Sequence, residues 1–168
     1  MPILYIAVMA VAFLLDRVVK NWAAGPLVDV HGGVLPLIPG VFQFTYAENR
    51  GAAFSILQGR TWLLIVLTAV ICLALILCAA LVIARMVKFR SQVDVTVFPS
   101  IAIALALGGA LGNLYDRVVL GYVIDMFDFC LINFAVFNVA DSFVNIGVVM
   151  LAIWMVFFEE KDKRRGDF

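Results

Sequence analysis

The chain has 168 residues, of which 65% are hydrophobic, and its mean hydropathy is +1.09. Soluble globular domains contain about 45 to 50% apolar residues, so this composition excludes an ordinary water-soluble domain and indicates an integral membrane protein. Twelve basic and twelve acidic residues cancel to a formal net charge of zero, which gives no indication of a nucleic-acid partner. The length predicts a single membrane-embedded domain over residues 1–168.

Four apolar segments are long enough to cross about 30 Å of hydrocarbon, which takes about 20 helical residues. They lie at residues 3–23, 62–84, 95–115 and 137–158. The first could be mistaken for a cleaved signal peptide. However, Met1 and Pro2 provide no basic start, and Asp16, Arg17 and Lys20 stand in its last turns. It is therefore predicted to be a retained spanning helix.

The basic residues of the short connections indicate the orientation, because cytoplasmic loops carry an excess of lysine and arginine. Seven basic residues follow the second and fourth segments: Arg85, Lys88, Arg90, Lys161, Lys163, Arg164 and Arg165. Both termini are therefore expected in the cytoplasm. This orientation places the ends of the first and third segments, and the start of the fourth, at the outer face of the membrane.

The connection over residues 25–60 is too long and too patterned for a simple linker. Its stretch 41–46 alternates between apolar and polar residues as a half-buried strand does, and Pro36, Pro39 and Gly40 precede it. Residues 52–57 predict a short helix in the membrane interface. The expected fold is therefore an all-α membrane protein with four transmembrane helices, a small extracytoplasmic β element and a short interfacial helix.

Polar side chains gather at the predicted outer ends of three segments. Polar groups facing lipid are expensive, so these stripes are expected to turn inward and to meet in one polar site. Each of two acids has a base within local reach, which predicts an ion pair of Asp16 with Lys20, four residues on, and of Asp116 with the adjacent Arg117. The stripes are Asp16 and Lys20, then Asn113, Asp116 and Arg117, then Asn138, Asp141, Ser142 and Asn145.

Asp125 and Asp141 have no basic neighbour in sequence, unlike the other acids of these stripes. A carboxylate at the hydrocarbon boundary is expected to have a raised pKa because of desolvation. Two such groups brought close together would share one proton, so that one can act as general base and the other as general acid. Asp116 and Asp128 lie near Asp125 in the chain, and sequence alone leaves them open as members of the pair, although Asp128 is expected to be a solvated loop residue.

Other chemistries fit the sequence less well. The one histidine, His31, stands in a glycine-rich loop, away from any serine or cysteine nucleophile and from any cluster with metal-ligand spacing. No metal or cofactor is therefore expected, and the glycines at 108, 109 and 112 are predicted to be a close-packing helix surface. A two-aspartate hydrolase fits best. The alternative is a small proton-coupled transporter or channel subunit that uses the same acids as a relay.

Four sequence blocks stand in order at residues 16–20 (DRVVK), 49–54 (NRGAAF), 112–125 (GNLYDR with GYVID) and 137–141 (FNVAD). On these blocks the chain resembles the lipoprotein signal peptidase family, also called signal peptidase II, over nearly its full length. This resemblance implies an aspartyl endopeptidase of the bacterial cytoplasmic membrane. Such an enzyme cuts prolipoproteins just before a cysteine that carries a diacylglyceryl group, so prolipoproteins and membrane lipids are the implied partners.

The same resemblance implies Asp125 and Asp141 as the catalytic pair. The family commonly has glutamine where this chain has Arg17, so the pairing around Asp16 is not implied by the resemblance. The matching positions that line or support the site are Asp16, Asn49, Gly51, Asn113, Arg117, Asn138 and Ala140. Lys20 and Asp116, which belong to the polar stripes, are also expected to support the site.

Overall fold

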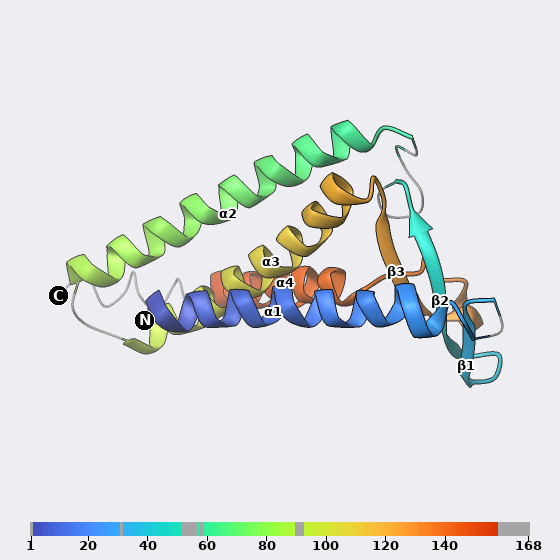
Figure 1. Cartoon of the computed structure of the whole chain (residues 1–168). Coiled ribbons are helices and arrows are strands. Elements are labelled where there is room, and N and C mark those ends of the chain that lie inside the picture. Colours follow the sequence, from blue (N-terminus) through green and yellow to red (C-terminus); the bar gives the residue numbers. More distant parts are fainter. Residues whose placement is uncertain (1, 31, 52–56, 58, 90–92, 158–168) are drawn as a thin grey trace.

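The computed structural model describes residues 2–30, 32–51, 57, 59–89 and 93–157. In these residues the protein is mostly helical, with a small three-stranded sheet at one end of the helices (Figure 1). The N-terminal end of α1 lies at the opposite end. The helices are α1 (Pro2–Trp22), α2 (Thr61–Phe89), α3 (Val93–Val119) and α4 (Val139–Phe157).

Helix α3 is the centre of the helical part. In the most apolar stretch of each helix, 61% of the α3 residues are buried, against 11% in α2 and in α4. Small residues allow this close approach: a Cβ at Gly108 would lie 2.7 Å from the Met9 carbonyl oxygen of α1. The predicted close-packing surface of α3 is thus confirmed at this position.

Three of the described helices are long and apolar enough to cross a membrane, at Thr61–Val82, Val97–Val119 and Val139–Phe157. They agree with the second, third and fourth predicted segments. Helix α1 is not among them, and its last turns carry the charged residues Asp16, Arg17 and Lys20.

Two predicted boundaries differ from the structure. Helix α2 continues to Phe89 rather than ending near residue 84, and α3 continues to Val119 rather than to residue 115. The longer α3 keeps Asp116 and Arg117 within the helix. The predicted interfacial helix falls mainly on residues 52–56, and most of the basic residues used for the orientation fall at residues 90 and 158–168, so both lie outside the described residues.

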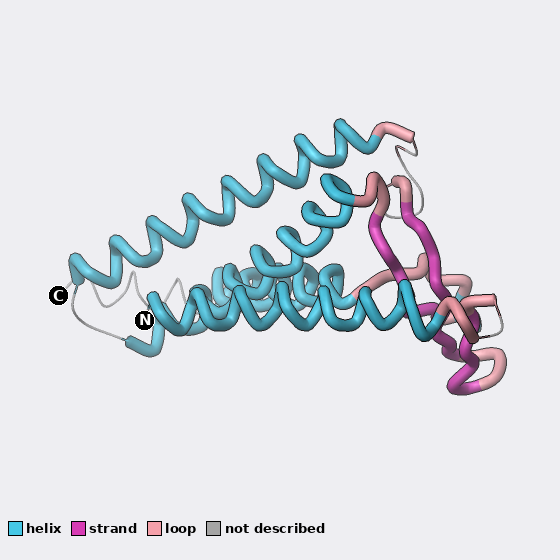
Figure 2. Tube along the Cα trace, in the orientation of Figure 1, coloured by secondary structure: helices cyan, strands magenta, loops and turns pink. Residues whose placement is uncertain are grey.

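The sheet is antiparallel, with the order β1-β2-β3, and it lies where α1 and α3 end and where α2 and α4 begin (Figure 2). The predicted strand over residues 41–46 is confirmed by β2. The third strand was not predicted, because it is buried over most of its length and shows no alternation of polar and apolar residues. The strands are β1 (Val34–Ile38), β2 (Phe42–Asn49) and β3 (Val123–Asp128).

A small apolar core joins the sheet to the helices. After α1 the chain makes one π-helical turn (Ala23–Leu27), and Leu27 is buried with Met126 of β3. Trp22 packs edge-to-face on Phe44 of β2, with ring centroids 5.1 Å apart. This core fixes β3 against the end of α1, and β3 carries Asp125.

Candidate active site

Asp125 and Asp141 meet at one asparagine. The Asn138 side-chain amide donates to Asp125 Oδ1 at 2.6 Å, and the Asn138 backbone N–H donates to Asp141 Oδ2 at 3.2 Å. The Asp141 backbone N–H donates back to Asn138 Oδ1 at 2.9 Å. This reciprocal bonding is a capping box, with Asn138 as the N-cap of α4 and Asp141 as its third residue. The cap that starts α4 therefore also connects the two carboxylates.

Asn113 of α3 contacts the same group. Its Nδ2 donates to Asp141 Oδ1 at 2.7 Å, and its Oδ1 accepts from Asn138 Nδ2 at 3.1 Å. Lys20 Nζ also donates to Asn113 Oδ1, at 2.8 Å. An ammonium group can only donate, so Lys20 requires the amide oxygen on its side and directs the Asn113 N–H groups toward Asp141.

The second oxygen of Asp125 is bound from the sheet. Asn49 Nδ2 at the end of β2 donates to Asp125 Oδ2 at 3.0 Å, and the Gly51 backbone N–H donates to Asn49 Oδ1 at 2.9 Å. The strand register places Asn49 opposite Val123, two residues before Asp125. Asn49, Asn113 and Asn138, called the asparagine network below, thus provide one donor to each Asp125 oxygen and, with the Asn138 backbone, to each Asp141 oxygen.

The surroundings of Asp125 raise the pKa of its carboxyl group to about 7. The main cause is burial, which disfavours the charged form, and the negative charge of Asp141 acts in the same direction. Hydrogen bonds from Asn49 and Asn138 and the charge of Lys20 oppose the rise. The upward shift expected for this residue agrees with this value, and it allows the Asp125 carboxyl group to hold a proton near neutral pH.

Asp16 and Asp116 belong to a second group of charges, which Lys20 connects through Asn113 to Asp141. Lys20 Nζ lies 3.1 Å from Asp16 Oδ2, which confirms the predicted local ion pair, and 2.8 Å from Asp116 Oδ2. Arg17 also pairs with both acids. The predicted pair of Asp116 with Arg117 is wrong, because α1 packs against α3 and presents its two cations to Asp116. These four side chains (Asp16, Arg17, Lys20 and Asp116) are called the ion-pair ring below.

Two further predicted site residues, Arg117 and Ala140, make hydrogen bonds that involve backbone groups. Arg117 donates to the carbonyl oxygens of Asn113 and Gly51, each at 3.5 Å. Ala140 is fully buried, and its backbone N–H donates to Asp16 Oδ1 at 3.0 Å. The side chain there must be small, because Ala140 packs against the glycine surface of α3.

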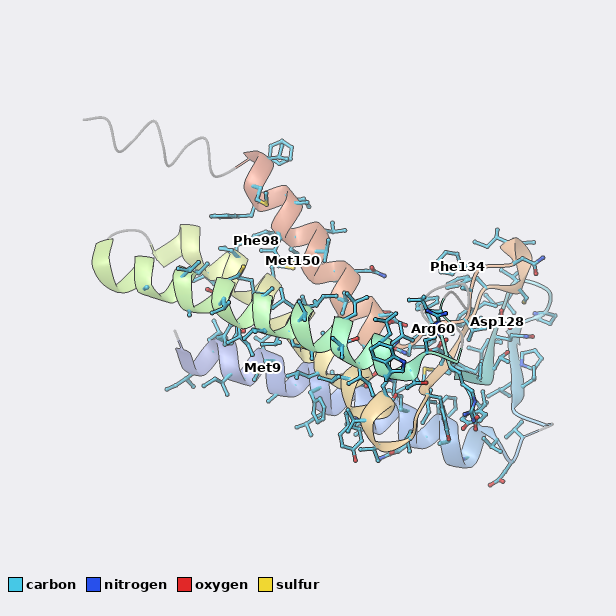
Figure 3. All side chains as sticks on the ribbon, turned by 90° about the horizontal axis from the view of Figure 1, so that it is seen from above. Met9, Arg60, Phe98, Asp128, Phe134 and Met150 are labelled. Carbon is cyan, nitrogen blue, oxygen red and sulfur yellow. The ribbon has the colours of Figure 1, made fainter. Side chains whose placement is uncertain are left out.

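Asp128 and Asn145 do not lie where the sequence predicts. Asp128 is not a solvated loop residue: it ends β3, and its Oδ2 accepts from Gln43 Nε2 at 2.7 Å and from Thr45 Oγ1 at 2.9 Å. Cross-strand pairing with Gln43 places it there. Asn145 is exposed on α4 rather than turned inward. Figure 3 shows Asp128 and Phe134 at the sheet end, whereas Met9, Phe98 and Met150 lie along the helix bodies.

The structure therefore brings the predicted site residues into one connected group at the sheet end. The contacts of Arg17 were not predicted: Asp16 is its neighbour in sequence, but its second partner, Asp116, is 99 residues away. The capping box was also not predicted, although the spacing of Asn138 and Asp141 could have indicated it. The residues in the connected group are Asp16, Arg17, Lys20, Asn49, Gly51, Asn113, Asp116, Arg117, Asp125, Asn138, Ala140 and Asp141.

Comparisons with known proteins show the family of the chain. The family model described as signal peptidase (SPase) II matches residues 8–157, so the chain belongs to the signal peptidase II family of aspartic peptidases. A lipoprotein signal peptidase from Clostridioides difficile (strain 630) is 42% identical over 160 residues, which cover 95% of this chain and 99% of that protein. A lipoprotein signal peptidase from Nostoc punctiforme is 43% identical over 143 residues, covering 85% and 83% of the two chains.

The fold is also similar to solved structures. A bacterial membrane enzyme determined by the in meso method at 1.9 Å resolution superposes with a TM-score of 0.71 and 30% sequence identity. The match covers 92% of this chain and 93% of that chain. A second such structure, at 2.3 Å resolution, has a TM-score of 0.72 and also 30% identity. The comparisons therefore show the signal peptidase II family, and the two similar structures are both described as bacterial membrane enzymes.

Proposed function

We propose that this enzyme cleaves the signal peptide from prolipoproteins immediately before a diacylglyceryl-modified cysteine, with Asp125 and Asp141 as its catalytic pair. The observation that carries the assignment is the bonding of both carboxylates to Asn138. Asp116 is held by two cations and Asp128 by Gln43 and Thr45, so these two acids are less suited to the pair.

In the proposed reaction the pair holds one proton. The ionised carboxylate removes a proton from a water molecule as its oxygen attacks the carbonyl carbon of the scissile peptide bond. The protonated carboxyl group donates its proton to the carbonyl oxygen. Collapse of this intermediate breaks the C–N bond: the leaving amine receives a proton from the pair, and one hydroxyl group of the intermediate returns its proton to the pair as the new carbonyl forms. One water is consumed, a carboxyl group and an amine are formed, and the pair returns to its starting state.

The asparagine network supports this chemistry by restricting how the carboxylates can turn. Each oxygen of the pair already accepts one hydrogen bond, which leaves further lone pairs for the water and the shared proton. The donors also stabilise the ionised partner, so the pair keeps one negative charge despite its burial. Gly51 holds Asn49, and Arg117 brings a positive charge beside the Gly51 carbonyl.

The lipid on the substrate explains why such an enzyme works within the membrane. Two acyl chains contribute about 0.8 kcal/mol for each buried CH₂ group, so the substrate stays in the bilayer. We infer that residues 1–168 form one domain of the bacterial inner membrane, with α1 as a fourth span, both termini in the cytoplasm and the sheet end at the outer face. The site would then lie at the depth of the lipid headgroups.

Cysteine labelling tests this orientation. On a background without Cys72, Cys78 and Cys130, an impermeant reagent added to intact cells should label Leu37→Cys on β1, which is 51% exposed. The same reagent should label Phe157→Cys at the end of α4 only after the membrane is opened. The reverse pattern would contradict the orientation.

Cleavage of a diacylglyceryl-modified prolipoprotein peptide by the purified enzyme tests the function. Mass spectrometry should show one cut before the modified cysteine, and the same peptide without lipid serves as the control. Asp125→Asn and Asp141→Asn should each abolish turnover while the protein still folds. The double variant should be about as inactive as either single variant, because the two groups act as a unit. Near-normal turnover of either single variant would refute the pair.

A further inference from the structure

The ion-pair ring is closed and buried. Arg17 donates through Nη2 to Asp16 Oδ2 at 2.6 Å and through Nη1 to Asp116 Oδ1 at 2.5 Å, while Lys20 bridges the same two acids on the other side. The side chains of Asp16, Lys20 and Asp116 have no exposed surface, and that of Arg17 is 15% exposed. Two positive and two negative charges make the ring neutral.

The remaining contacts of the ring lead directly to the proposed catalytic pair. Asp16 Oδ1 accepts the backbone N–H of Ala140 at 3.0 Å, and Asp116 Oδ2 accepts the backbone N–H of Ile124 at 3.3 Å. Ala140 immediately precedes Asp141, and Ile124 immediately precedes Asp125. The two acids of the ring therefore hold the backbone next to each member of the pair, and through it the separation of the two carboxylates.

Lys20 makes the third connection. Its three N–H groups match its three acceptors: Asp16, Asp116 and the Asn113 oxygen that orients the amide toward Asp141. Lys20 can serve all three only because Arg17 supplies the second positive charge. If Arg17 were neutral, one lysine would face two buried carboxylates, and an uncompensated buried charge is costly enough to force protonation or rearrangement.

We propose that Arg17 is a positioning residue for the catalytic pair, because it neutralises the ring that fixes the backbone before Asp125 and before Asp141. This inference rests on the proposed pair. Two further contacts hold the Arg17 guanidinium in place. Its Nη2 also donates to the Gly112 carbonyl oxygen at 3.1 Å, and the group lies 4.8 Å from the centre of the Tyr115 ring. Its planar fork reaches both acids at once, which a single ammonium at that position would not do.

A ring that only stabilised the helices would change the folded fraction and leave the turnover of each folded molecule unaltered. A positioning ring instead lowers kcat, because small displacements of reacting groups slow the chemical step, and leaves KM nearly unchanged. The ring is buried and offers almost no surface to a substrate, so its disruption should leave substrate affinity nearly unchanged. A change in kcat without a matching change in KM therefore distinguishes a positioning ring from one that only stabilises the fold.

The test compares four variants with the unmodified enzyme on the lipidated peptide, at matched folded concentration. They are Arg17→Gln, Asp116→Asn, the double variant Arg17→Gln/Asp116→Asn, and the control Arg60→Gln. Each single change in the ring unbalances its charge. The double variant is again neutral, and an asparagine oxygen at position 116 can still accept from Lys20 and from the Ile124 N–H. Arg60 is an exposed arginine at the same end of the molecule (Figure 3).

We expect Arg17→Gln and Asp116→Asn each to lower kcat by about tenfold, with KM changed by less than about twofold. The double variant should recover to within about threefold of the unmodified enzyme, and Arg60→Gln should match it. A normal kcat for folded Arg17→Gln, or a loss found only in KM, would overturn the proposal. If Arg17→Gln does not fold, the double variant decides: an active double variant supports charge balance, and an inactive or unfolded one overturns it. Activity of the unmodified enzyme, and its loss in Asp125→Asn, test the catalytic pair separately.

Discussion

Replacing Asn138 by alanine or by serine should separate the stability of the site from its chemistry. Asn138 makes three side-chain contacts: Oδ1 accepts the Asp141 N–H at 2.9 Å, and Nδ2 donates to Asp125 Oδ1 at 2.6 Å and to Asn113 Oδ1 at 3.1 Å. Alanine removes all three. Serine restores the helix cap, since its hydroxyl oxygen accepts the same N–H, but it cannot provide both amide donors.

The magnitudes follow from these contacts. Loss of an N-cap costs about 1 kcal/mol, so Asn138→Ala should be less stable than Asn138→Ser by about that amount. A hydrogen bond to a charged group contributes about 1.5 to 3 kcal/mol, and one pKa unit corresponds to about 1.4 kcal/mol. Removal of the donor to Asp125 should therefore raise the pKa of this carboxyl group above its value of about 7 by about one unit or more in both variants.

The direction in which the pH dependence of activity should move follows from the singly protonated pair. Deprotonation of Asp125 ends activity at high pH, so a higher pKa moves the alkaline limb of the kcat/KM profile upward. The assay is peptide cleavage between about pH 5 and pH 9, with stability measured by thermal unfolding in the same detergent. Equal upward shifts in the two variants, with a stability gap between them, are expected. An unmoved or lowered alkaline limb in Asn138→Ser would refute the reasoning.

Three other changes follow from the site. Gly112→Ala would place a Cβ 2.5 Å from Asp16 Oδ2, so thermal unfolding should show a loss of about 1 to 3 kcal/mol, and unchanged stability would contradict the packing of α1 on α3. The raised pKa of Asp125 means that the folded state binds its proton more tightly than the unfolded state does. The stability gained from this tighter proton binding is complete below about pH 4 and is lost as the pH rises to about 7. The Tm of the unmodified enzyme should therefore fall over this range more than the Tm of Asp125→Asn. Parallel plots of Tm against pH for the two proteins would contradict the raised pKa. Asp128→Asn keeps an oxygen for Gln43 and Thr45, so peptide cleavage should stay within about twofold of normal, and an inactive variant would move the catalytic assignment to Asp128.

The membrane class, three helices long and apolar enough to cross a membrane, and strand β2 were all predictable from the sequence alone, because each depends on a local pattern. An apolar run of sufficient length predicts a spanning helix whatever surrounds it, and alternation over residues 41–46 predicts a strand with one buried face. The pair of Asp16 with Lys20 was also predictable, since residues four apart in a helix share one face.

Contacts between distant parts of the chain could not be predicted from local patterns, because they depend on how the helices and the sheet pack. Asp116 has Arg117 as its neighbour in sequence, yet it pairs with Arg17 and Lys20, because the packing of α1 on α3 brings two buried cations closer. Asp125 depends on β3 pairing with β2, which places Asn49 within hydrogen-bonding distance. Sequence spacing carries no information about such pairings. They form because a buried charge or amide requires a partner, and the fold determines which partner is within reach.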